Sequence, residues 1–304
     1  MKSVVATSGQ DLDHATMPGT AYLSPLSQVL RIAQYQLTEF ARSRRLLVLV
    51  GVAVAIGVIL TVVVARFHST FEVGPSSFYS TLWGGGAGPV IALAAVLLGG
   101  DAIAGEFQNR TGYFLMGLPL RRASVYLGKY LAALLASLLV LALFFTILVA
   151  DASYLFGSSA LTWTLALSFA LATTYLSAVL ATAFLLSSLF KNGVYSFVLT
   201  ALLFLVGFSL VQDFMQGLAQ LQPWELISYA SQTIGEVFQP SVHWGLTGTG
   251  VQAPSVGGNG GVNLHTGNVV DWTPGIAEGA VIMAAYWALT LLAGLSLFER
   301  EEFA

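Results

Sequence analysis

LLVLVGVAVAIGVILTVVVA, the stretch Leu46–Ala65, decides the fold class of this chain. A helix needs about 20 mostly apolar residues to cross the roughly 30 Å hydrocarbon core of a bilayer, and this stretch has that length without one charged side chain. Five further stretches share this character, so the sequence predicts an all-α membrane protein that crosses the bilayer six times. The predicted spans are Leu46–Ala65, Trp83–Gly100, Leu131–Ala150, Leu161–Leu189, Val194–Val211 and Ile276–Phe298.

Positive charge is distributed unequally between the two ends of these spans. If the N-terminus is placed in the cytoplasm, only Arg66 of the 12 Lys and Arg residues falls on the outer side. Short cytoplasmic loops carry an excess of Lys and Arg. The sequence therefore predicts a multi-pass protein of the plasma membrane with both termini in the cytoplasm. The predicted cytoplasmic cations are Lys2, Arg31, Arg42, Arg44, Arg45, Arg110, Arg121, Arg122, Lys129, Lys191 and Arg300.

The composition predicts one membrane domain, residues 25–304, behind a short polar segment. Charged residues make up 9% of the chain, against about 25% in soluble proteins. Residues 1–24 lack the apolar core of a signal peptide, and we expect a mobile cytoplasmic tail. The net charge of −3 and the absence of a cationic face away from the membrane argue against a nucleic-acid partner. With no cysteine, disulfides and thiolate metal sites are excluded.

Residues 25–45 are predicted to form an amphipathic helix at the cytoplasmic membrane surface. Apolar side chains recur there at three- and four-residue steps, with polar side chains between them, and the segment leads directly into the first span. Two interpretations stay open. The helix either flanks the membrane without a partner or also packs against another cytoplasmic element.

The second span begins with an unusual run of glycine, from Trp83 to Pro89. Glycine permits close approach of another backbone, or a break in the helix. Gly84 and Gly88 form a single G-x-x-x-G pair, which is a weak signal in a glycine-rich helix.

Residues 212–275 form the only large predicted extracellular element. We expect amphipathic helical pieces in the first half, with Pro223 in a first helical turn. Residues 240–275 have the composition of a loop or of short hairpins over the outer mouth. His243 and His265 lie in this second half, and two histidines without further ligands are more typical of an ordinary surface than of a metal site. We therefore predict no metal.

The stretch DAIAGEFQNRTGYFLMGLPLRRASVYLGK, Asp101–Lys129, joins the second and third spans in the cytoplasm. It predicts a short helix over residues 101–118, which Gly117 and Pro119 would end. Glu106 and Arg110 stand four residues apart, in the favourable order for an ion pair on a helix surface. From the residues alone, a docking element for another protein and a set of solvated loop charges are equally good interpretations.

Several kinds of chemistry are absent from the sequence. It contains no G-x-x-x-x-G-K-[ST] loop for nucleotide phosphates and no H-E-x-x-H or G-x-S-x-G motif, so no catalytic residue is predicted. The cores of the predicted spans carry no Asp, Glu, Lys, Arg or His. Ion-coupled transporters usually carry such residues within the membrane. A transport activity would therefore draw its energy from outside the membrane domain.

The stretch after the second span resembles the signature of the type-2 (exporter) permeases of ABC transporters. That pattern is roughly D-x-I-x-G-E-x-x-x-x-T-x-x-x-L-x-x-x-P-x-x-R followed by G-K. The chain departs from it at residues 107–109, where the family usually carries charged residues. Together with the six spans, the resemblance covers most of the chain from Leu26 and is nearest to small stand-alone permeases. The matching positions are Asp101, Ile103, Gly105, Glu106, Thr111, Leu115, Pro119, Arg122, Gly128 and Lys129.

This resemblance implies an all-α permease subunit that works with a second permease copy, as a homodimer, and with separate P-loop ATPase subunits. ATP and magnesium would then bind in the ATPase and not in this chain. It implies an ATPase-coupling element at Gly105, Glu106, Arg110, Thr111 and Arg122. It further implies an extracellular gate, to which we assign Trp224, Glu225, Ile227 and Glu236.

The first hypothesis for the function is therefore an ATP-driven exporter. The alternative is a membrane assembly or immunity factor, which would use the same ATPase to extract or block a membrane-embedded peptide or lipid. The apolar spans favour a hydrophobic or lipid-like cargo.

Overall fold

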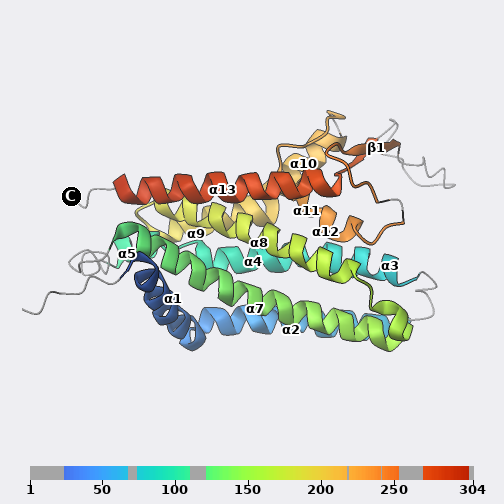
Figure 1. Cartoon of the computed structure of the whole chain (residues 1–304), viewed down its shortest axis with the longest axis horizontal. Coiled ribbons are helices and arrows are strands. Elements are labelled where there is room, and N and C mark those ends of the chain that lie inside the picture. Colours follow the sequence, from blue (N-terminus) through green and yellow to red (C-terminus); the bar gives the residue numbers. More distant parts are fainter. Residues whose placement is uncertain are drawn as a thin grey trace, which may run out of the picture.

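The computed structural model of the chain describes residues 24–67, 74–109, 121–217, 219–240, 242–252 and 270–300. Within them, six helical segments are long and apolar enough to cross a membrane, and they run side by side as an elongated bundle (Figure 1). The predicted all-α, six-span class is confirmed. The spans are α2 (Arg44–Phe67), α3–η2–α4 (Pro75–Phe78, Tyr79–Gly84, Gly85–Gly99), α7 (Arg122–Phe156), α8 (Thr164–Leu189), α9–η4–α10 (Gly193–Leu202, Leu203–Gly207, Phe208–Gly217) and α13 (Ile276–Arg300).

The second span begins eight residues before the predicted start at Trp83. Pro75 opens the helix, as proline favours a first turn, and the π-helical segment η2 carries it into α4 without a break. Window hydropathy misses this first part because it contains Ser, Thr and Tyr. The indole nitrogen of the fully buried Trp83 donates a hydrogen bond to Ser168 Oγ at 2.8 Å, so its polar atom is satisfied inside the bundle.

The glycines at the start of this span allow a close backbone contact and do not break the helix. A Cβ atom at Gly84 would lie 2.7 Å from the Cα atom of Gly235, in the short helix α12 (Thr233–Glu236). Only a residue without a side chain permits this approach. A Cβ atom at Gly88, the other member of the G-x-x-x-G pair, would meet nothing within 4 Å.

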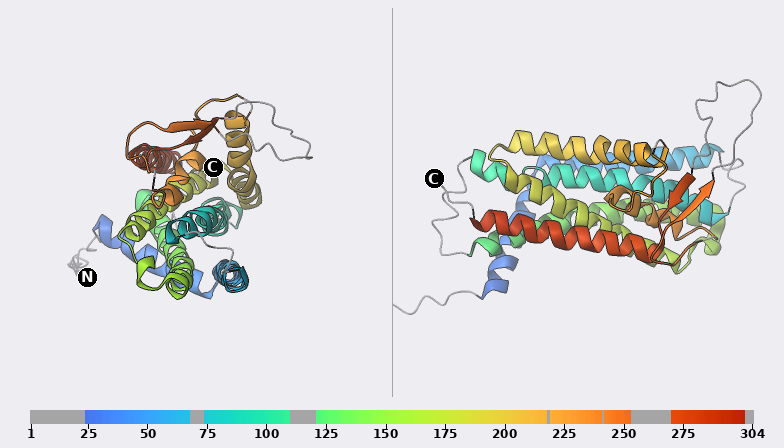
Figure 2. Two further views of the ribbon diagram at one scale, coloured as in Figure 1. Left: turned by 90° about the vertical axis from the view of Figure 1, so that its right-hand side faces the viewer. Right: turned by 90° about the horizontal axis from the view of Figure 1, so that it is seen from above.

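The helix α1 (Pro25–Arg42) packs against the first half of α7 and lies across one end of the bundle (Figures 1 and 2). The Ser24 side chain caps its N-terminus by accepting from the Ser27 N–H at 3.3 Å. The buried Gln28 accepts a hydrogen bond from the Arg121 N–H at 3.3 Å. Of the two interpretations left open by the sequence, packing against another element is the one observed. The predicted tail lies outside the described residues, apart from Ser24.

The segment between α10 and α13 folds over the opposite end of the bundle. It contains α11 (Ile227–Ser231), α12 and an antiparallel hairpin of β1 (Thr249–Gln252) and β2 (Val270–Thr273). The predicted short hairpin is therefore observed. The prediction that Pro223 opens a helix was wrong, because α11 begins only at Ile227. The hydroxyl of Tyr286 on α13 takes the Glu225 carbonyl as its acceptor, at 2.5 Å.

The two ends of the bundle differ in charge. Among the described residues, Arg66 lies at the hairpin end, whereas the other Lys and Arg side chains lie on elements that begin or end at the α5 end, where α5 is Ala104–Gln108 (Figure 1). The start of α1 and the end of α13 also lie at the α5 end. The structure thus reproduces the unequal charge distribution on which the predicted orientation was based.

Candidate functional site

The candidate site is a sharp corner between α4 and α5. Helix α4 ends at Gly99, residues 101–103 form a turn, and α5 runs from Ala104 to Gln108. The predicted helix over residues 101–118 is thus helical from Ala104, and residues 110–118 lie outside the described residues. This corner carries the Gly-Glu pair of the signature stretch.

Two serines form hydrogen bonds between the corner and neighbouring spans. Ser187 on α8 accepts hydrogen bonds from the backbone N–H groups of Ile103 and Ala104, at 2.9 and 3.0 Å. These N–H groups stand at the start of α5, where a helix has no internal acceptor for them. Ser196 on α9 donates a hydrogen bond to the Gly100 carbonyl. All of these contacts are buried, so the corner is held against the fourth and fifth spans.

Gln108 forms a third link, at the other end of α5. Its side-chain oxygen accepts a hydrogen bond from the Gly193 N–H at 2.9 Å. Gly193 is the first residue of α9, so Gln108 satisfies one of the free N–H groups of that helix. Gln108 belongs to the tripeptide that departs from the family pattern, and here it ties α5 to the fifth span.

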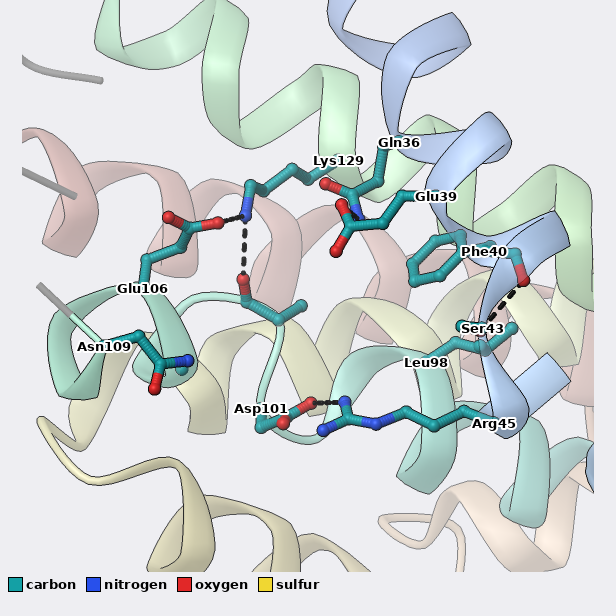
Figure 3. Close-up of a pocket in the computed structure, with 12 residues that line it drawn as sticks. Gln36, Glu39, Phe40, Ser43, Arg45, Leu98, Asp101, Glu106, Asn109 and Lys129 are labelled. Atoms are coloured by element: carbon teal, nitrogen blue, oxygen red, sulfur yellow. Dashed lines mark hydrogen bonds and ion pairs between the residues drawn. The ribbon is translucent and has the colours of Figure 1, made fainter. Parts of the chain in front are cut away.

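An ion pair with little solvent exposure links α5 to the third span. The ammonium group of Lys129, on α7, contacts the Glu106 carboxylate and donates to the Ala102 carbonyl at 3.2 Å (Figure 3). The side chains of Lys129 and Glu106 are 8% and 27% exposed. Because both charges lose much of their water, removing one partner leaves the other poorly compensated.

A second ion pair joins the corner to the first span. The Arg45 guanidinium, at the start of α2, lies 2.6 Å from the Asp101 carboxylate (Figure 3). The Arg45 side chain is 52% exposed, so water and salt screen this pair and its contribution to stability is small. The corner therefore has contacts with α2, α7, α8 and α9.

A polar cleft of about 280 Å³ lies between this corner and α1 (Figure 3). Among its lining residues, Gln36 on α1 donates a hydrogen bond to Glu39 at 2.8 Å. A search of the described residues finds no group of three His, Cys, Asp or Glu placed to hold a metal ion. The cleft is lined by Gln36, Glu39, Phe40, Ser43, Arg45, Leu98, Asp101, Ala102, Gly105, Glu106, Asn109 and Lys129.

The structure describes three of the five residues assigned to the coupling element, and of these only the neighbours Gly105 and Glu106 line the cleft. Gly105 and Glu106 lie in α5, facing the cleft. Arg122 is the first residue of α7 and donates a hydrogen bond to the Glu299 carbonyl on α13, at 3.0 Å. Arg110 and Thr111 lie outside the described residues.

The partners of the corner were not among the predicted site residues. Lys129 was predicted only as a cytoplasmic cation and as a match to the signature, although a lone lysine at the border of a long apolar helix could have suggested a partner inside the protein. Nothing in the sequence distinguishes Ser187 and Ser196 from other serines in apolar helices, because their roles depend on tertiary contacts.

The four residues assigned to the extracellular gate do not share one environment. Trp224 and Glu225 are exposed on a turn, Ile227 is buried in the core, and Glu236 ends α12 and is partly exposed. None of them lines the cavity of about 390 Å³ beside Pro75, Trp163 and Trp244, or the cavity of about 300 Å³ between the second and fifth spans. The gate assignment stays a prediction.

Comparison with known proteins identifies the family. A search of the curated proteins finds no match. The family model described as "ABC-2 family transporter protein" matches residues 30–303, nearly the whole chain. Members of this family are membrane components of transporters, and the family implies association with an ABC ATPase. With its six apolar spans and this match, the chain is a multi-pass membrane protein that belongs to the ABC-2 family of transporters.

Proposed function

We propose that the chain is the translocating subunit of an ATP-driven exporter, active as a homodimer with two separate ATPase subunits. ATP and magnesium would bind in those subunits, since the sequence contains no P-loop. The charge distribution supports a cytoplasmic α5 end and cytoplasmic termini in the plasma membrane. The ATPase would then contact α5 from the cytoplasm.

The observation that carries this proposal is the way α5 is attached to the spans. Ser187 and Ser196 tie the corner to α8 and α9, and Lys129 ties it to α7. A helix held by buried polar contacts at several points moves together with its supports. Displacement of α5 by ATP-driven closure of the partner would therefore be transmitted to the spans as a rigid-body shift.

The residues that would make direct contact with the ATPase are those on the outer side of the corner. Asn109 is exposed at the end of α5. The resemblance adds Arg110 and Thr111, which follow it directly. Glu106 would have a double role, because it is partly exposed and also holds Lys129.

The test is a gentle-detergent purification of the chain, with mass spectrometry of the proteins that accompany it. We expect a P-loop ATPase in near-equal amount, which is lost in the double variant Glu106→Ala, Arg110→Ala. The matched control is Arg31→Ala, which removes an exposed cation from α1 at the same end and should retain the ATPase. A wild-type chain that purifies alone, under conditions that preserve other membrane complexes, would overturn the proposal.

A further inference from the structure

A second cavity, of about 300 Å³, lies within one copy of the chain, toward the hairpin end. The cavity is partly open, and it is lined by the second span, by Tyr175 of the fourth span, by η4 and α10 of the fifth span, and by α11 with the following Gln232. Its volume is at the lower end of the range found for small-molecule sites. None of its lining residues belongs to the α4–α5 corner.

The polarity of this cavity changes along the bundle. Pro89, Ala92 and Phe204 line the end nearer the middle of the spans, and all three are apolar. Gln212 and Gln232 line the other end, together with three serines. These are Ser209, Ser228 and Ser231. A molecule with an apolar part and a hydrogen-bonding part would match both ends in a single orientation.

The space exists because side chains are missing on one face of the second span. A Cβ atom at Gly85 or Gly88 would meet nothing within 4 Å. The π-helical segments η2 and η4 contribute Gly84, Phe204 and Leu205 to the lining. Segments of this kind are rare and frequently occur at functional sites.

One buried polar atom at this cavity lacks a partner. The side-chain oxygen of Gln232 is buried and accepts no hydrogen bond in the described structure. Leaving a buried acceptor unpaired is costly, so a rotation of the Gln232 side chain that brings its oxygen to a hydroxyl or amide donor of a ligand would be favourable.

The lining contains no charged side chain. A charged ligand would lose its water there without gaining a counter-charge, which is strongly unfavourable. We propose that this cavity binds an uncharged amphiphile, with its hydrogen-bonding head at Gln212 and Gln232 and its apolar tail toward Ala92. The proposal rests on the proposed function only in naming this molecule as cargo, because the binding itself needs neither ATP nor the ATPase.

The test uses the absence of cysteine from the chain, which makes a single introduced thiol a clean reporter. The variant Gly88→Cys places that thiol in the open part of the cavity. Its rate of reaction with a maleimide dye is measured in proteoliposomes without ATP. The probe is 1-octanoylglycerol, and octanoate and octylammonium serve as charged molecules with a chain of the same length. At ten times its Kd, 1-octanoylglycerol should slow the labelling about tenfold, whereas the charged molecules should not.

The matched control is Gly51→Cys on α2, where a Cβ atom also meets nothing within 4 Å but which lies outside the cavity. Its labelling should not respond to the probe. A second variant, Gly85→Phe in the Gly88→Cys background, fills the cavity and should abolish the protection. Equal protection by all three molecules, protection of Gly51→Cys, or no protection by 1-octanoylglycerol would overturn the proposal. These outcomes leave the ATPase purification unaffected, so failure of the site and failure of the proposed function are distinguishable.

Discussion

At the scale of single residues, the two ion pairs of the α4–α5 corner contribute differently to stability. Lys129 is buried and bonds both Glu106 and a backbone carbonyl. Arg45 is half-exposed beside Asp101. The same kind of contact therefore has a structural role in the first pair and only a minor one in the second.

We predict that Lys129→Met lowers the free energy of unfolding by about 3 kcal/mol, because the Glu106 carboxylate loses its ion pair with Lys129 and the Ala102 carbonyl loses that donor. Arg45→Met, the control, should cost less than about 1 kcal/mol. Chemical denaturation of the two variants in detergent checks this. The double variant Lys129→Met, Glu106→Gln should recover much of the loss, and a double-mutant cycle without coupling would contradict the pairing.

The contacts of individual residues are the part of the site that the sequence could not supply. Arg45 and Asp101 lie 56 positions apart, and Ser187 lies 84 positions from Ile103. Local pattern says nothing about pairs at such separations. The Gly-Glu pair could be predicted, because it belongs to a contiguous motif, whereas its supports come from other spans.

At the scale of elements, long spans were predictable and short or irregular ones were not. Long stretches of apolar residues identify helices such as α7 and α13, since helices of this kind are stabilised by apolar surroundings along their length. The second span begins at Pro75, but the polar side chains that follow lower the local hydropathy, and the bond of Trp83 to Ser168 that satisfies one polar group inside the bundle joins two spans. Pro223 is followed by a turn at Trp224 and Glu225, so α11 begins only at Ile227.

We predict that Ser187→Ala increases local opening of α5 and of the turn that precedes it. Two buried N–H groups would lose their acceptor, at a cost of about 1–3 kcal/mol. Hydrogen–deuterium exchange of a peptide that covers residues 100–108 should become faster. The control is Ser188→Ala, whose hydroxyl bonds only the Leu185 carbonyl within its own helix. Equal exchange in both variants would contradict the role of Ser187.

The contact between η2 and α12 gives a further prediction at this scale. Gly84→Leu inserts a side chain where a Cβ atom would already lie 2.7 Å from the Gly235 backbone. The melting temperature should fall, because α12 must move away from the second span. Gly88→Ala enters open space and should leave stability unchanged or raise it by up to about 1 kcal/mol. A Gly84→Leu protein that melts at the wild-type temperature would show that this contact is not needed.

At the scale of the whole molecule, the two ends of the bundle differ in charge and in the elements that cover them. The α5 end carries the basic residues, the corner and the polar cleft. The hairpin end carries the segment of α11, α12 and the two strands. This asymmetry, together with the family match, is the basis on which we propose that transport is driven from the α5 end.

The orientation of the bundle can be measured with single cysteines. In intact cells, a membrane-impermeant maleimide should label Gly74→Cys, at the hairpin end, and should leave Arg31→Cys, on α1, unlabelled until the membrane is permeabilised. The opposite pattern would reverse the orientation and place α5 outside the cell.

We propose that α5 is the contact for a partner ATPase. The most direct test of this is photocrosslinking in living cells from benzoylphenylalanine at position 109, where Asn109 is exposed at the end of α5. We expect a crosslink to a protein with a P-loop, and none when the same group replaces Tyr154, which is 85% exposed toward the opposite end. A crosslink to such an ATPase from position 154 but not from position 109 would show that the ATPase does not dock on α5.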